Sequence, residues 1–188
     1  MTVSSSVSKK KITTSSTAEY FAKNLQQVGF SSPMKAVLTT LKESLDNALD
    51  ACEESHILPE IKVVVKKVGK GSTRSSDKIL IRVEDNGPGI ELKDIPMVFG
   101  QYLASSKFGR GRCSRGQQGI GISAATTWAQ QSSATGARVI TKKANQRRAI
   151  SCLVVTDLKN NKGVVKEKQS IEVNKDHGTT VEFLILLF

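Results

Sequence analysis

The sequence predicts one domain of the α/β class, in which helices pack against a sheet. Three observations lead to this prediction. Residues 33–55 show helical periodicity throughout. Two glycine boxes, residues 84–89 and 116–123, stand where elements begin or end. Apolar and β-branched runs of strand length recur along the rest of the chain, at residues 61–67, 78–83, 137–143, 150–156, 166–173 and 179–187.

The N-terminal residues 1–17 are rich in Ser, Thr and Lys, a composition typical of disordered segments. We therefore expect the folded domain to cover residues 18–188, a length that suits one domain with a sizeable core. Residues 18–28 have helical character and precede the long helix predicted at residues 33–55.

The predicted helix at residues 33–55 has an apolar face and a polar face. Glu43, Asn47 and Asp50 follow the spacing i, i+4 and i+7, so they share one face. The apolar stripe, which we expect to be buried roughly opposite them, consists of Leu38, Leu41, Leu45, Ala48, Leu49 and Cys52.

This polar face has the chemistry of a magnesium–nucleotide site. Mg²⁺ prefers hard oxygen ligands and takes only one or two from the protein beside phosphate oxygens and water. Asn47 can supply such an oxygen without adding negative charge near a triphosphate. Glu43, one turn earlier, can polarise an attacking water as a general base. Taken alone, the pattern is more typical of a solvated helix face, and the glycine boxes decide against that.

The first glycine box follows the predicted strand at residues 78–83 and must turn sharply. Asp85 on this turn can accept a hydrogen bond from an exocyclic amine, such as that of adenine. Gly87 and Gly89 let a flat base approach the backbone. By itself this motif is more typical of a plain turn that carries a capping Asp.

The second box precedes a helix predicted at residues 124–131. Glycines that enter a helix expose backbone N–H groups, and the helix N-terminus adds partial positive charge, so together they form a phosphate cradle. No Gly-Lys-Ser/Thr closes the box, which excludes a P-loop. The cradle residues are Gly116, Gln117, Gln118, Gly119, Ile120, Gly121, Ile122 and Ser123.

Residues 99–115 between the boxes are rich in Gly, Ser, Lys and Arg. We expect this segment to fold over the nucleotide as a lid whose basic side chains neutralise triphosphate charge. Ser106 and Lys107 are the expected direct contacts. A solvated basic loop is the alternative.

Composition limits the partners. The net charge of +11 favours polyanions, either a nucleotide or DNA. Aromatic residues make up only 5%, so contact with duplex phosphates is expected in place of stacking on single strands. Cys52, Cys113 and Cys152 have neither metal nor disulfide spacing. No apolar run reaches membrane-spanning length, so we expect no membrane contact and a cytoplasmic location.

Together the motifs resemble a known superfamily. The order Glu-x-x-x-Asn-Ala-x-x-Asp, Asp-x-Gly-x-Gly, Gly-x-x-Gly-x-Gly and a late Gly-Thr is similar to that of the ATPases of gyrase, heat-shock chaperones, histidine kinases and MutL. Within this superfamily the sequence most resembles the B subunits of DNA topoisomerase VI. The runs that carry this resemblance are residues 45–54, 114–125 and 177–183.

The resemblance implies a role for each matching position. Glu43 matches the general base, Asn47 the Mg²⁺ ligand and Asp85 the carboxylate that binds adenine. Thr179 matches a threonine that supports this carboxylate through water. The implied cofactor-binding set is Asn47, Asp50, Asp85, Gly87, Gly89, Ser106, Lys107, Gly116, Gln117, Gln118, Gly119, Ile120, Gly121, Ile122, Ser123 and Thr179.

The resemblance also implies a Bergerat-type two-layer sandwich, with a mixed, mostly antiparallel sheet, helices on one face, and ATP and Mg²⁺ between the layers. It implies a type IIB topoisomerase, associated with the nucleoid. There, ATP-dependent dimerisation of two B subunits gates the passage of duplex DNA, which a partner A subunit cuts within a heterotetramer. We expect the helical insert and the transducer domain of such subunits, with its phosphate-binding lysine, to be absent. This stretch is therefore expected to bind ATP but to turn it over poorly alone.

Three other functions fit parts of the sequence. The first is a non-catalytic module that dimerises or recruits a partner when ATP binds, with negligible hydrolysis because the transducer lysine is missing. A sensor-kinase ATPase domain is disfavoured because no phospho-acceptor helix precedes the motifs. A basic nucleic-acid-binding domain would leave the spacing of the glycine boxes unexplained.

Overall fold

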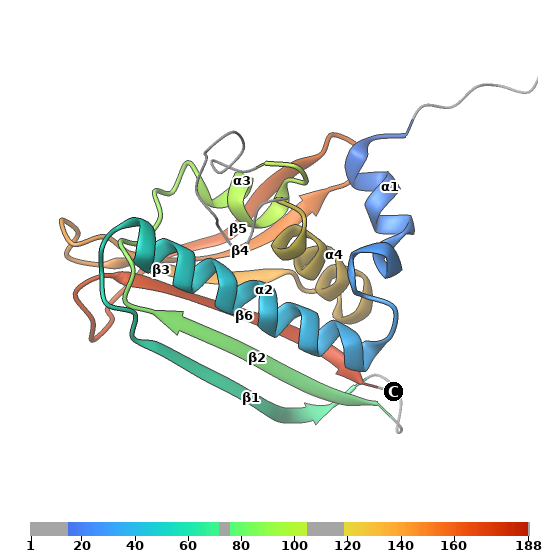
Figure 1. Ribbon diagram of the computed structural model, residues 1–188, viewed down its shortest axis with the longest axis horizontal. Coiled ribbons are helices and arrows are strands. Elements are labelled where there is room, and N and C mark those ends of the chain that lie inside the picture. Colours follow the sequence, from blue (N-terminus) through green and yellow to red (C-terminus); the bar gives the residue numbers. More distant parts are fainter. Residues whose placement is uncertain (1–14, 72–75, 105–118, 188) are drawn as a thin grey trace, which may run out of the picture.

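Six strands form one antiparallel sheet, and the helices pack on one of its faces (Figure 1). The computed structural model describes residues 15–71, 76–104 and 119–187. The strand order is β1-β2-β6-β3-β4-β5. This confirms the predicted two-layer sandwich. The sheet was expected to be mixed, but every neighbouring pair in the described part is antiparallel.

The elements follow the predicted order, with one addition and one division. The helix expected at residues 18–28 is divided at Asn24, because its backbone leaves the helical region there. The bounds are α1 (Thr17–Lys23), η1 (Leu25–Val28), α2 (Pro33–Glu54), β1 (Ile61–Lys70), β2 (Asp77–Asp85), α3 (Ile95–Gly100), α4 (Gly121–Ser133), β3 (Ala137–Lys142), β4 (Ala149–Asp157), β5 (Lys162–Ile171) and β6 (Gly178–Leu187).

The start of helix α2 agrees with the start predicted from the sequence. The Ser32 side chain accepts a hydrogen bond from the Lys35 N–H, and Pro33 occupies the first turn, where its missing N–H costs nothing. In Figure 1 this helix runs along the sheet, and it packs mainly over β2 and β6. The position of α2 sets one wall of the site described below.

The buried face of α2 agrees with the predicted stripe at Ala48 and Cys52 and differs from it elsewhere. Leu38 is 61% exposed, whereas Asp50, expected on the open face, is only 3% exposed. Most of the buried residues are small or carry a hydroxyl. The Ser44 hydroxyl donates a hydrogen bond to the Thr40 carbonyl oxygen at 2.7 Å. Small side chains let the helix lie close to the sheet. The buried set is Ala36, Val37, Thr40, Ser44, Ala48, Asp50 and Cys52.

Helix α3 was not predicted, and Phe99 was assigned to the lid. Phe99 is instead 4% exposed in the core. The helix lies against β5, and a side chain at Gly163 would collide with the carbonyl oxygen of Pro96, so the contact requires glycine. Helix α3 has six residues, which is fewer than two turns. Because a helical repeat of apolar residues needs a longer window, the sequence pattern could not reveal this helix.

Candidate functional site

A cavity of about 200 Å³ lies between α2 and the sheet. Both layers contribute to its walls, and most of its lining is apolar, as in a site for a flat organic group. Few polar side chains enter it. Its lining residues are Ser44, Asn47, Ala48, Ala51, Glu54, Val83, Asp85, Pro88, Gly89, Ile90, Val98, Phe99, Ile122, Thr179 and Val181.

Asp85 ends β2, and its half-buried carboxylate lines this cavity. Its Oδ1 accepts hydrogen bonds from the N–H of Gly87 at 2.8 Å and of Thr179 at 3.1 Å. Burial raises the pKa of Asp85, and the two N–H groups oppose this shift. No described residue donates to Oδ2. The carboxylate is therefore fixed through one oxygen and keeps acceptor capacity on the other.

The turn after Asp85 requires glycine at position 89 and leaves little room for a side chain at position 87. Gly89 has φ +74°, and a side chain there would collide with the Lys142 carbonyl oxygen. A Cβ at Gly87 would lie 2.9 Å from Asp85 Oδ1. Beyond the turn, the Ile90 N–H donates to the hydroxyl of Thr141 at 2.8 Å. The predicted turn thus packs tightly against β3.

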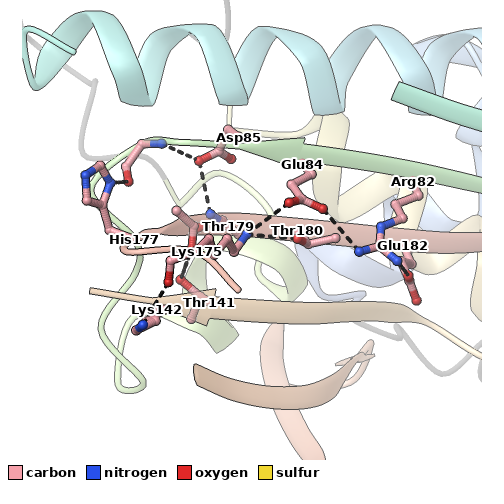
Figure 2. A network of polar contacts seen from close by, with 12 residues as sticks. Arg82, Glu84, Asp85, Thr141, Lys142, Lys175, His177, Thr179, Thr180 and Glu182 are labelled. Atoms are coloured by element: carbon pink, nitrogen blue, oxygen red, sulfur yellow. Dashed lines mark hydrogen bonds and ion pairs between the residues drawn. The ribbon is translucent and has the colours of Figure 1, made fainter. Parts of the chain in front are cut away.

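Thr179 makes a direct hydrogen bond to Asp85. The expectation was support through water, whereas its backbone N–H reaches the carboxylate itself. Its Oγ1 lies 3.1 Å from Oγ1 of Thr141. Figure 2 shows this pair beside the Asp85 side chain. Nothing in the sequence pointed to Thr141, because its place depends on the pairing of β3 with β6.

The three polar residues of α2 that were predicted to share one face lie in different surroundings. Asn47 lines the cavity, and its amide makes no hydrogen bond with any other described residue. Glu43 lies outside the lining, but its carboxylate is so close to Gly121 that a side chain there would collide with it. Asp50 is buried and is not among the lining residues. Of these three residues, only Asn47 lines the cavity.

Glu43 and the first turn of α4 meet at one end of the site. Helix α4 begins at Gly121, and a carboxylate near a helix N-terminus is favoured by the helix dipole. The Lys42 ammonium lies 3.5 Å from Glu43 and 2.7 Å from Asp46. Ile122 of the same turn lines the cavity.

The described part of the second glycine box is Gly119 to Ser123. Gly119 has φ +60°, and its carbonyl oxygen accepts from the Leu103 N–H at 2.9 Å. The Ser123 hydroxyl donates to the Gln101 carbonyl oxygen at 2.9 Å, so it is used inside the fold. The other predicted contacts lie outside the described residues: Ser106, Lys107, Gly116, Gln117 and Gln118.

Three further observations concern the cysteines, metal binding and membrane crossing in the described part of the chain. Cys52 and Cys152 are buried free thiols, as predicted for small core residues. Among residues 15–71, 76–104 and 119–187, no three His, Cys, Asp or Glu side chains gather as a metal-binding group. In the same ranges, none of the helices combines the length and the apolar character needed to cross a membrane.

Comparison with known proteins agrees with this geometry. The chain is 46% identical over 167 residues to the B subunit of type 2 DNA topoisomerase 6 from Archaeoglobus fulgidus, covering 89% of this chain and 27% of that protein. It is 42% identical to the protein of the same name from Methanococcoides burtonii (92% and 27%) and 37% identical to that from Pyrococcus furiosus (92% and 29%). The chain thus spans little more than a quarter of the length of these relatives.

A solved structure titled as the N-terminal domain of a DNA repair protein overlaps 90% of this chain and 41% of that chain at 17% identity, with a TM-score of 0.47. The family model described as histidine kinase-, DNA gyrase B-, and HSP90-like ATPase matches residues 34–187. That range includes α2 from its second residue, all six strands and the cavity between them. The chain therefore belongs to the family of histidine kinase-, DNA gyrase B- and HSP90-like ATPases.

Proposed function

We propose that this chain is the ATP-binding part of a type IIB DNA topoisomerase B subunit, and that ATP and Mg²⁺ bind between α2 and the sheet. The observation that carries the proposal is the half-buried Asp85 carboxylate, held by two backbone N–H groups at the wall of an apolar cavity. A fixed acceptor between apolar walls selects a flat ring with an amine at its edge.

At the adenine end, Asp85 accepts from the exocyclic amine, and Thr179 keeps the carboxylate in position. The pocket walls exclude water, which strengthens this hydrogen bond. Val83, Ile90 and Val181 contact the faces and edges of the base. The fit is that of adenine, because guanine presents a carbonyl oxygen where adenine presents the amine.

At the phosphate end, Asn47 holds Mg²⁺ and the first turn of α4 receives the phosphates. Mg²⁺ supplies neutralisation of triphosphate charge there. The side-chain amide of Asn47 fits this role, since it borders the cavity and the described residues leave its oxygen available. The N–H groups that open α4 favour anions. Glu43 beside Gly121 accepts a proton from the attacking water.

In the complete enzyme, ATP binding joins two B subunits, and this closes a gate through which duplex DNA passes. The A subunit of the heterotetramer cuts the DNA in this scheme. The names of the archaeal relatives support the scheme, as does the charge of +11, which suits a polyanionic partner.

Calorimetric titration with a non-hydrolysable ATP analogue tests binding, and phosphate release from ATP tests turnover. We expect binding that depends on Mg²⁺, together with measurable hydrolysis that Glu43→Gln abolishes. Binding without any hydrolysis, in a longer chain that carries the segments of the archaeal relatives, would favour an ATP-responsive dimerisation module. A folded chain that binds no nucleotide would contradict the proposal.

A further inference from the structure

The loop between β5 and β6 contacts the turn after Asp85 through His177. Its Nδ1 lies 2.8 Å from the carbonyl oxygen of Gly87, and Figure 2 shows the ring at this turn. A carbonyl oxygen only accepts hydrogen bonds, so Nδ1 must carry the proton and donate it. His177 is half-buried and is not among the residues that line the cavity. It therefore holds the turn without reaching the bound base.

Both backbone polar groups of Gly87 are engaged. Its N–H donates to Asp85 Oδ1, and its carbonyl oxygen accepts from His177. Gly87 is buried and has no side chain to fix its peptide planes. Its N–H and its carbonyl belong to two peptide planes joined at the Gly87 Cα, so a held carbonyl restricts the rotations that would move the N–H away from Oδ1. Among the described residues, that group is the imidazole of His177.

The loop that delivers His177 is held at two further points. The Lys142 ammonium donates to the Lys175 carbonyl oxygen at 2.8 Å, and the Lys175 ammonium donates to the Thr180 hydroxyl at 3.1 Å. Glu84 lies 3.9 Å from the same ammonium. Directly after His177, Gly178 has φ +122°, and a side chain there would collide with the backbone of Asp85. A loop fixed in this way can position a side chain reliably.

We propose that His177 is a positioning residue for base recognition: by holding the Gly87 carbonyl, it orients the Asp85 carboxylate toward the exocyclic amine of the nucleotide. The inference rests on the proposed function, because the amine belongs to the proposed ligand. A histidine that only stabilised the loop would affect all nucleotides alike. A positioning residue affects those that offer an amine to Asp85 and spares those that do not.

The test compares His177→Ala, His177→Asn and His177→Gln. The amide nitrogen of Asn lies where Nδ1 of His lies, whereas that of Gln lies where Nε2 lies. Each variant is titrated with a non-hydrolysable ATP analogue and with the matching inosine analogue, in which a carbonyl oxygen replaces the amine. His56→Asn is the matched control, since His56 is exposed and has a positive φ that Asn tolerates.

We expect His177→Ala to weaken the ATP analogue roughly threefold to tenfold, the worth of one hydrogen bond, and to leave the inosine analogue unchanged. The preference for the amine then falls by the same factor. His177→Asn keeps the preference, His177→Gln loses it, and His56→Asn changes nothing. Equal losses for both nucleotides, or no recovery with Asn in a variant that melts like the wild type, would overturn the proposal.

Amide hydrogen exchange of Gly87, measured without nucleotide, separates this inference from the proposed function. Faster exchange of this amide in His177→Ala than in wild type and His177→Asn supports the positioning role, even if the wild type binds neither nucleotide and the proposed function fails. An unchanged exchange rate in His177→Ala would overturn the positioning role, whatever the wild type binds.

Discussion

Replacing Asp85 by Asn changes the charge of the turn but keeps its shape. Oδ1 of the amide still accepts from the N–H groups of Gly87 and Thr179, while the amide nitrogen replaces Oδ2 and brings a donor where the adenine amine needs an acceptor. A hydrogen bond to a charged group contributes about 1.5–3 kcal/mol, and a buried unpaired donor costs about 1–3 kcal/mol. The lower ends add to about 2.5 kcal/mol, so affinity falls by roughly 70-fold or more.

The same substitution changes how stability depends on pH. Burial raises the pKa of Asp85 above its value in the unfolded chain. A group shifted in this direction contributes stability below its unfolded pKa, and the contribution is lost as the pH rises through the folded pKa. At pH 7 the ionised carboxylate therefore destabilises the fold. We expect Asp85→Asn to melt above the wild type at pH 7, with the difference fading below the ordinary Asp pKa of about 4.

Calorimetric titration measures the affinity, and scanning calorimetry at several pH values measures the stability. Asp176→Asn is a suitable control, because this exposed carboxyl lies on the neighbouring loop and has no role in the cavity. Unchanged affinity in Asp85→Asn would refute the role of the carboxylate in base recognition. A lower melting temperature at pH 7 would show that the two N–H groups outweigh burial.

Three further predictions follow from the packing of the site. Glu43→Gln should lower kcat at least about 100-fold, as for loss of a general base, and change the affinity for an ATP analogue less than about threefold; an equal loss in Lys42→Gln would point to helix charge instead. Gly89→Ala should abolish nucleotide binding in a calorimetric titration, because the added methyl group collides with the Lys142 backbone; retained affinity would show that the turn can move. Leu38→Ala should change the free energy of unfolding by less than about 0.5 kcal/mol, since the side chain is exposed, whereas the buried Val37→Ala should cost about 2 kcal/mol in denaturant titration; equal costs would favour the stripe predicted from the sequence.

Sequence patterns located the cavity because its chemistry is carried by short motifs. Asp85, Gly87 and Gly89 come from one turn, and their spacing alone predicts a carboxylate at a tight bend. The structure adds the reason for each glycine, which is the close approach of β3 and the Asp85 side chain. Asn47 was predicted from helical spacing and borders the cavity with Asp85.

Features that depend on long-range pairing were not visible in the sequence. Thr141 and His177 reach the turn only because β3, β6 and the loop before β6 lie beside it. The buried face of α2 was misjudged for a related reason. Hydropathy favours Leu38 for burial, but the close approach of helix and sheet favours small residues such as Thr40 and Ser44.

The most direct test of the account is a crystal structure of the chain with a non-hydrolysable ATP analogue and Mg²⁺. The account predicts the adenine amine within hydrogen-bonding distance of Asp85, Mg²⁺ on the Asn47 side-chain oxygen, and the phosphates at the first turn of α4. A nucleotide bound elsewhere, or an adenine that does not meet Asp85, would contradict it.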